Sequence, residues 1–128
     1  YVGLSQWDVL PSAFHLPGIQ GGWFAMPSPT RAEQFRDRFQ SVYGNAPHPL
    51  AAIAYDGVAA VGASVATGNR DALNSKGLTL TGGFQGAAGI FRLRNNGTIE
   101  RGLAVATIEG NQVVVLDEAP RTFSNFGF

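Results

Sequence analysis

The amino-acid sequence predicts an α/β fold, and three observations support this prediction. Short apolar segments that fit strands lie near the start of the chain, at 1–5 and 21–26. Two longer segments, 30–43 and 50–67, carry apolar residues at helical spacing. The last third of the chain alternates strand residues with turn residues, which predicts a C-terminal antiparallel hairpin region. We expect the whole of 1–128 to be a single segment of one domain.

The first predicted strand ends beside polar and aromatic residues. It is Tyr-Val-Gly-Leu-Ser, and Trp7 and Asp8 follow at its carboxyl end. Open α/β sheets place their ligand crevice at this end of a strand. One helical turn is expected at 9–14, and the second strand, Gly-Gly-Trp-Phe-Ala-Met, is closed by prolines.

The segment 30–43 carries the clearest helix signals. Thr30 as N-cap and Glu33 three residues later form a capping box, which satisfies free backbone donors at the start of a helix. Gly44 occupies the position of a left-handed C-cap. The predicted apolar stripe consists of Phe35, Phe39, Val42 and Tyr43, with Arg31, Arg36, Asp37 and Arg38 on the solvent side.

The next helix, 50–67, is built mainly from small residues and contains one distinctive polar pair, Tyr55-Asp56. Residues at three- and four-residue spacing predict one buried face, made of Leu50, Ile53, Ala54, Gly57, Val58, Val61 and Val65. The pair is either part of a hydrogen-bonded core or the floor of a binding cleft. A carboxylate in an apolar helix needs a partner, and for Asp56 a backbone hydrogen bond is favoured over ligand contact.

The remainder of the chain predicts short elements. Asn69 is expected to cap a short helix at 73–75, and the glycine-rich segment 78–89 is expected to be mostly irregular. Strands are predicted at 90–94, 103–108 and 112–116. Asn96-Gly97 suits a type I′ hairpin turn, and 109–111 is a second turn. The three phenylalanines of the tail, Phe123, Phe126 and Phe128, are expected to dock against the fold.

Composition excludes several classes of function. The net charge is zero and no Lys/Arg run occurs, so the chain lacks the basic patch typical of nucleic-acid or anionic-membrane binding. Arg92, Arg94 and Arg101 are interpreted as part of a solvated strand face. The absence of cysteine excludes disulfides and thiolate metal sites. No apolar run reaches the roughly 18 residues that span a bilayer.

Catalytic motifs are scarce. His15 and His48 lie in proline-flanked loops, and no Gly-x-Ser-x-Gly elbow is present. The glycine-rich 82–89 lacks the Gly-Lys-Ser/Thr ending of a phosphate loop. We therefore expect a binding protein without cofactor or metal, and not an enzyme; a small hydrolase using either histidine is the least favoured class. Trp7, Tyr55 and Phe84 suit a cleft, because aromatic rings supply large contact areas, and each also suits a core.

The order of these elements resembles the C-terminal part of the type I periplasmic binding proteins, the branched-chain amino-acid receptor family. Segment 39–47, Phe-Gln-Ser-Val-Tyr-Gly-Asn-Ala-Pro, resembles the family's Tyr-Gly-x-x-Pro element, and 54–57, Ala-Tyr-Asp-Gly, resembles its Ala-Tyr-Asp-Ala helix. Segment 86–105 looks especially like the lipoprotein subfamily of penicillin-binding-protein activators.

The resemblance implies a hinged, two-lobed receptor that grips a ligand between its lobes without catalysis. Because the family's chain crosses between the lobes three times, this segment is expected to hold parts of both, and an N-terminal part is expected to be missing. Ser5, Gln6 and Trp7 match the cleft edge of the second lobe. Tyr55 matches the helix start that faces the cleft from the first lobe, and its neighbour Asp56 completes the candidate ligand-binding set.

The predicted cleft departs from amino-acid receptors in one respect. Such receptors commonly place a carboxylate in the cleft, whereas this strand end offers Ser5 and Gln6, with Asp8 beyond Trp7. The departure favours the activator subfamily, with a peptidoglycan synthase as partner. The alternative is the solute receptor of an ABC transporter, which binds an amino acid or similar small polar ligand and docks on the permease. Both alternatives imply a periplasmic protein, and the first implies a lipid anchor through the absent N-terminus.

Overall fold

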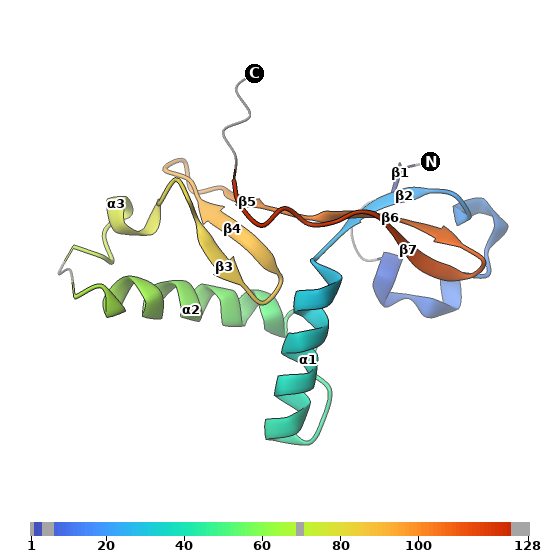
Figure 1. Ribbon diagram of the computed structural model, residues 1–128, viewed down its shortest axis with the longest axis horizontal. Coiled ribbons are helices and arrows are strands. Elements are labelled where there is room, and N and C mark those ends of the chain that lie inside the picture. The colour runs from blue at the N-terminus through green and yellow to red at the C-terminus, as the bar shows by residue number, and fades with distance from the viewer. Residues whose placement is uncertain (1, 4–6, 69–70, 124–128) are drawn as a thin grey trace.

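The computed structural model describes residues 2–3, 7–68 and 71–123, and these form two separate sheets (Figure 1). The first sheet has the order β1-β2-β6-β7 and the second has the order β3-β4-β5. The first consists of β1 (Val2–Gly3), β2 (Trp23–Met26), β6 (Ala104–Glu109) and β7 (Gln112–Asp117), and the second of β3 (Phe84–Gly86), β4 (Gly89–Leu93) and β5 (Ile99–Arg101). The predicted α/β class and the C-terminal hairpins are confirmed.

The first sheet has a continuous apolar core. β1 pairs with β2 in parallel, and the other pairings are antiparallel. The core consists of Phe24, Met26, Ala104, Ala106 and Ile108, with Trp7 packed against it. Gly110 and Asn111, with φ of 57° and 64°, form the turn between β6 and β7. Two left-handed residues in a two-residue connection are typical of a type I′ turn.

The single helical turn predicted at 9–14 is replaced by short 3₁₀ turns. These are η1 (Trp7–Val9), η2 (Pro11–Ala13) and η3 (Pro17–Ile19). A proline stands at the first position of η2 and of η3. Its fixed φ suits the start of a turn, and it donates no backbone hydrogen bond, so a longer helix does not continue through it.

The second sheet corrects one prediction and refines another. The segment 78–89, expected to be mostly irregular, is so except for its end residues and the short strand β3, whose buried residues Phe84 and Gly86 alternate with the exposed Gln85. At the hairpin of 94–98 only Gly97 is left-handed, with φ of 80°, and its N–H donates to the carbonyl oxygen of Arg94. The turn is therefore a three-residue connection with a glycine after a type I turn, not type I′. The local signal identified a hairpin but not its length.

The helix α1 (Pro29–Tyr43) has its predicted C-terminus and a different N-terminus. Gly44, with φ of 76°, donates its N–H to the carbonyl oxygen of Gln40, which confirms the C-cap. Ser28 rather than Thr30 is the N-cap residue, and no side chain caps this end. Pro29 occupies the first turn, where its fixed φ favours initiation with an N-cap two residues before the predicted one. The predicted capping box is absent for this reason, and Glu33 pairs with Arg36 at 3.7 Å instead.

The helix α2 (Ala51–Ala66) has the predicted extent but buries the opposite face from the one predicted. Its buried residues are Asp56, Ala60 and Ser64. The predicted buried face is solvent-exposed, with Val58 75% exposed; its other exposed members include Leu50, Ile53, Val61 and Val65. The helix rests on β3, where Ala60 packs with Phe84 and Phe91. The partner of Asp56 lies on this side, so the polar residue sets the rotation of the helix.

The short helix α3 (Ser75–Leu78) starts two residues later than predicted. Its cap is Asn74, whose Oδ1 accepts a hydrogen bond from the N–H of Gly77 at 3.0 Å. The predicted cap, Asn69, lies outside the described residues. In the tail, Phe123 lies under the guanidinium of Arg92, 4.5 Å from ring centroid to Cζ, whereas Phe126 and Phe128 lie outside the described residues.

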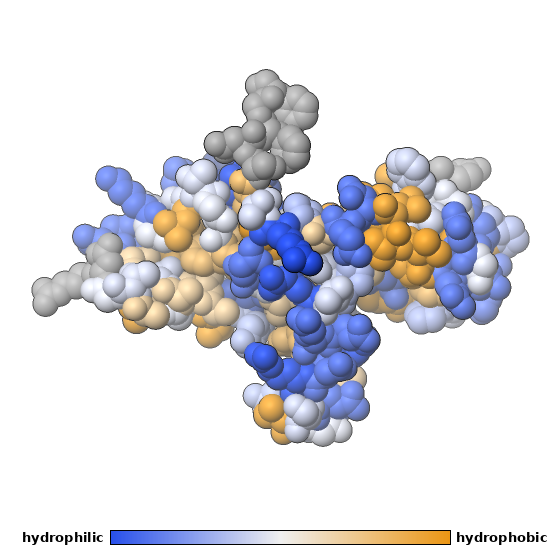
Figure 2. All heavy atoms as spheres, viewed as in Figure 1, coloured by the Kyte–Doolittle hydropathy of each residue, from blue (hydrophilic) through white to orange (hydrophobic). Residues whose placement is uncertain are grey.

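In the part of the chain that the structure describes, three segments connect the two sheets. The chain passes from β2 toward α1 at 27–28, and from β5 to β6 at 102–103. After β7 it runs back toward the second sheet over 118–123 (Figure 1). Figure 2 shows apolar side chains gathered over β6 and β7 and hydrophilic side chains over α1. No helix within the described ranges has the length and hydropathy to cross a membrane.

Candidate functional site

The predicted site residues are distributed over different parts of the fold. Ser5 and Gln6 lie outside the described residues. Trp7 packs on the first sheet, 5.6 Å from Phe24 between ring centroids. Tyr55 lies on α2 beside the second sheet and is half-exposed. Trp7 and Tyr55 therefore lie beside different sheets, and of the two hollows described below neither is lined by both residues.

Asp56 is fully buried and anchors α2 to the turn between β3 and β4. Its Oδ1 accepts a hydrogen bond from the N–H of Ala87 at 2.5 Å, and its Oδ2 accepts from the N–H of Ala88 at 3.4 Å. Arg101 of β5 donates to the same Oδ2 at 2.9 Å. A Cβ on Gly86 would lie 2.5 Å from this carboxylate, so only glycine leaves room for it. The expected backbone hydrogen bonds are present.

The arginines near β4 and β5 are engaged in ion pairs, which corrects the interpretation of a plain solvated face. Arg92 and Arg94 both donate to Glu100, from their Nε atoms at 2.8 and 3.0 Å. These hydrogen bonds, that of Arg92 first, lower the pKa of the Glu100 carboxyl below its usual value. Arg101 instead turns inward to Asp56 and lies over the Phe91 ring, 4.9 Å from its centroid. Sequence spacing does not distinguish these roles.

The β3–β4 hairpin contacts all three connecting segments. The carbonyl oxygen of Ala88 accepts from the N–H of Ser28 at 3.3 Å, and that of Ile90 accepts from Gly102 at 2.9 Å. Gln85 donates its side-chain amide to the carbonyl oxygen of Arg121 at 2.7 Å. We call this arrangement the junction. Through it, the Asp56 anchor is linked to every segment that joins the two sheets.

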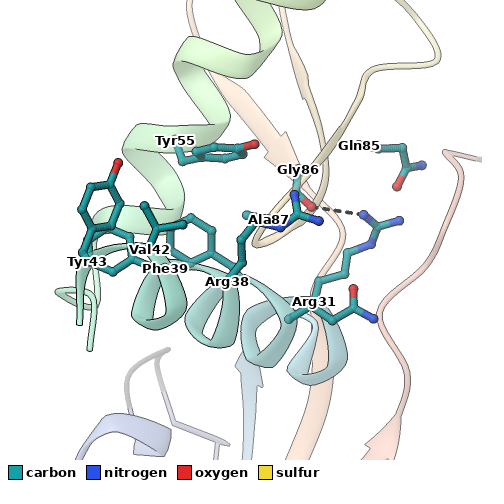
Figure 3. Close-up of a pocket in the computed structure, with 11 residues that line it drawn as sticks. Arg31, Arg38, Phe39, Val42, Tyr43, Tyr55, Gln85, Gly86 and Ala87 are labelled. Atoms are coloured by element: carbon teal, nitrogen blue, oxygen red, sulfur yellow. Dashed lines mark hydrogen bonds between the residues drawn. The ribbon is translucent and has the colours of Figure 1, made fainter. Parts of the chain in front are cut away.

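A cavity of about 440 Å³ lies between α1, the start of α2 and the β3–β4 turn (Figure 3). It is lined by Arg31, Gln34, Phe35, Arg38, Phe39, Val42, Tyr43, Tyr55, Gln85, Gly86 and Ala87. We call it the α1 cavity. The ring centroids of Phe35 and Tyr55 are 5.4 Å apart, and those of Phe39 and Tyr43 are 4.5 Å apart. Its size falls in the range of roughly 300–1,000 Å³ that is typical of small-molecule sites.

The charge in the α1 cavity is positive. Arg31 donates from Nη1 to the carbonyl oxygen of Gly86 at 3.3 Å. In Figure 3 the side chains of Arg31 and Arg38 both extend toward the turn at Gly86 and Ala87. No aspartate or glutamate is among its lining residues within the described chain. The helical pattern predicted both arginines on the solvent side; their seven-residue separation on the face of Phe35 was the signal that could have identified them.

A second, more polar hollow of about 530 Å³ lies at the junction. It is lined by Ser28, Thr30, Arg31, Gln34, Gly89 and 118–121. It therefore adjoins the connecting segments that leave β2 and β7. Arg31 and Gln34 line both hollows, so the start of α1 separates one from the other.

The two histidines lie away from both hollows. His48 accepts a hydrogen bond at Nδ1 from the N–H of Leu50 at 3.2 Å, and His15 is exposed in its loop. Among the residues that the structure describes, no group of three or more His, Cys, Asp and Glu is placed to hold a metal ion.

Comparison with known proteins identifies the fold. No family model matches the chain, and no curated protein matches it. Solved structures do match: the two linked sheets correspond to part of the two-lobed type I periplasmic binding protein fold. The predicted fold is thus confirmed. The chain spans about 36% of the length of the first matching structure.

The matching structures are solute-binding or transporter proteins, and three of them are described here. One, described as a branched-chain amino acid ABC transporter from Rhodospirillum rubrum, has a TM-score of 0.73 and 21% identity over 90% of this chain. A substrate-binding protein from Desulfitobacterium hafniense in complex with Leu has a TM-score of 0.58 and 20% identity. The match covers 90% of this chain and 35% of that protein. A solute-binding protein from R. palustris in complex with benzoate has a TM-score of 0.54 and 20% identity. The match covers 93% of this chain and 35% of that protein.

Proposed function

We propose that the chain is the C-terminal part of a non-catalytic periplasmic solute-binding protein of an ABC transporter. The observation that carries this proposal is the pair of sheets joined by three segments that meet at the junction. Short connecting segments allow two packed bodies to rotate about a hinge and close over a ligand. The ligand is an amino acid or a similar small polar solute, and the partner is the transporter permease.

The exposed face of α2 supports a larger protein around this segment. Val58 and its apolar neighbours leave a contiguous surface that a packed domain normally covers. We propose that the remaining part of a two-lobed fold packs on this face. The segment would then contribute one sheet to each lobe.

The proposed ligand residues lie on both sides of the hinge. Trp7 packs on the first sheet, and Ser5 and Gln6 directly precede it in the sequence. Tyr55 lies on α2, beside the second sheet. Closure of the two bodies would bring such residues toward a shared ligand. Asp56, which we grouped with them, is occupied by Ala87, Ala88 and Arg101, and its proposed contribution is to hold Tyr55 in place.

The activator of peptidoglycan synthesis is the weaker alternative. Its support was the strand end without a carboxylate at Ser5 and Gln6 and the segment 86–105. The fold accounts for the distinctive residues of the latter segment. Gly86 makes room for Asp56, Arg101 pairs with Asp56, and Gly97 forms a hairpin turn. These residues therefore favour no particular protein partner, whereas the solved structures favour a solute receptor. A lipid anchor belongs to this alternative only.

A ligand screen by thermal and urea unfolding tests the proposal on the protein that carries this chain. The screen covers amino acids, small peptides and organic acids. A solute at 100 times its Kd is expected to raise the free energy of unfolding by about 2.7 kcal/mol. Tyr55→Phe is expected to weaken that response, and Asp37→Ala, exposed on α1 and outside both hollows, is the control that is expected to leave it unchanged. No response to any of the three classes, together with co-purification of a peptidoglycan synthase, would replace this proposal with the activator alternative.

A further inference from the structure

The α1 cavity combines an apolar aromatic wall with two arginine side chains. We infer that it binds a small organic carboxylate with an apolar or aromatic body. This inference goes beyond the proposed function, because the cavity is formed by α1, α2 and the β3–β4 turn alone. It needs no closure of one sheet on the other.

The charge of the cavity selects an anion. Arg31 and Arg38 are seven residues apart on α1 and line the same cavity. Arg36, on another face of the helix, pairs with Glu33, whereas no ion pair of Arg38 occurs among the described residues. Arg31 donates one hydrogen bond to the carbonyl oxygen of Gly86, which leaves its other N–H donors for a ligand. A guanidinium carries five N–H donors in a fork that matches the two oxygens of a carboxylate.

The wall of the cavity selects an apolar body. Phe35, Phe39 and Tyr55 form a row of rings, with centroid separations of 6.0 Å along α1 and 5.4 Å across to α2. Tyr55 is 50% exposed and Tyr43 is 66% exposed, so part of this aromatic surface is uncovered. An apolar ligand would remove that surface from water, which is favourable in proportion to the area buried. Tilted ring contacts add to this for an aromatic ligand.

The floor of the cavity is fixed before any ligand arrives. The Ala87 N–H is bound to Asp56, and the Gly86 carbonyl oxygen accepts from Arg31. The turn is thus held by a buried carboxylate on one side and by the cavity's own arginine on the other. A preorganised site binds with a smaller entropic cost than one that must order on binding.

The scale of the cavity favours a small molecule over a macromolecule. About 440 Å³ fits a single small ligand, and the chain carries no basic stretch beyond these two arginines that would follow an acidic polymer. The apolar wall favours an organic carboxylate over inorganic phosphate, which has no apolar surface to bury.

Calorimetric titration with 3-phenylpropionate, its neutral amide 3-phenylpropanamide and inorganic phosphate tests the inference. The acid is expected to bind about tenfold or more tightly than the amide, because only the acid forms charge-assisted hydrogen bonds with the arginines. Inorganic phosphate is expected to bind more weakly than the acid. Equal affinities for acid and amide, tighter binding of phosphate, or no binding of the acid in the millimolar range would each overturn the inference.

Matched arginine variants locate the site. Arg38→Gln is expected to weaken binding of the acid about tenfold and to leave binding of the amide unchanged. Arg36→Gln, on the same helix but outside the cavity, is expected to change neither. Melting temperatures of both variants establish that folding is retained. Equal losses in the two variants would assign the effect to the general charge of α1 and overturn the inference, while leaving the solute screen on the two-sheet protein unaffected.

Discussion

The two sheets of this chain are stabilised in different ways. The first sheet buries the apolar residues of one face, where Phe24, Ala104, Ala106 and Ile108 are at most 2% exposed, while Trp23, Val114 and Leu116 stay exposed. The helix of the second sheet turns its valines outward and buries Asp56. The first region is held by apolar packing, and the second is oriented by a buried ion pair. Buried ion pairs contribute little net stability but cost much when one partner is removed. The two regions should therefore respond differently to substitution.

Phe24→Ala in the first sheet is expected to be one of the two most destabilising substitutions considered, together with Asp56→Ala. Removing a buried phenylalanine costs about 3–5 kcal/mol of unfolding free energy, through lost transfer energy and the cavity left behind. Val58→Ala on the exposed face of α2 should change it by no more than about 0.5 kcal/mol. Urea unfolding of the chain measures both. In a longer protein that covers α2, the cost of Val58→Ala should rise. Similar costs for both variants in this chain would contradict the contrast between the regions.

Asp56→Ala is expected to destabilise the second region by about 3–5 kcal/mol, because it leaves the Arg101 guanidinium without its buried partner. Asp37→Ala, on the exposed side of α1, serves as the matched control and should change the unfolding free energy by no more than about 0.5 kcal/mol. Denaturant unfolding and a double-mutant cycle with Arg101→Ala measure the coupling. Additive effects in the cycle would show that the pair does not act as an anchor.

Two glycine substitutions sharpen the comparison within the second region. Gly86→Ala should cost about 1–3 kcal/mol, since its Cβ would fall 2.5 Å from the Asp56 carboxylate. Gly62→Ala, where a Cβ on α2 meets nothing within 4 Å, should stabilise by about 0.5–1 kcal/mol through the better helix propensity of alanine. Thermal unfolding distinguishes them, because Gly86→Ala should lower the melting temperature and Gly62→Ala should raise it. A neutral Gly86→Ala would mean that the carboxylate has room to move.

The smallest expected effect is the pH dependence of stability that comes from Glu100. The pKa of Glu100 is lowered in the folded chain, so the unfolded chain binds more protons in the acidic range. The contribution of Glu100 to the free energy of unfolding is thus fully present above the ordinary carboxyl pKa. It is lost as the pH falls through the lower pKa that this carboxyl has in the folded chain. The stability difference between wild type and Glu100→Gln should narrow on acidification and shrink in high salt. Urea titrations across the acidic range measure it, and a constant difference would contradict the prediction.

The comparison also shows what local sequence signals predict. The extent of α2, the end of α1 at the Gly44 cap and the strands from 104 to 117 follow from spacing, turn residues and propensity. The start of α1 and the type of turn at Gly97 were missed, because neighbouring residues offered two compatible local solutions. Of the residues that line the α1 cavity, sequence reasoning proposed Tyr55 as a ligand residue but not Arg31 or Arg38. Charged residues on a helix are usually solvated, and only the packed position of α2 and the β3–β4 turn makes that face a cavity.

The sequence by itself determined that this chain forms α2, and that its lone carboxylate needs a partner, because periodicity and desolvation act locally. Only the tertiary structure decided which face of α2 turns inward. The apolar stripe predicted one rotation of the helix, and the buried contact of Asp56 with Ala87 and Arg101 selected the other. A helix can rotate about its axis without changing its backbone hydrogen bonds, so its orientation depends on contacts with residues 31 to 45 positions further along the chain.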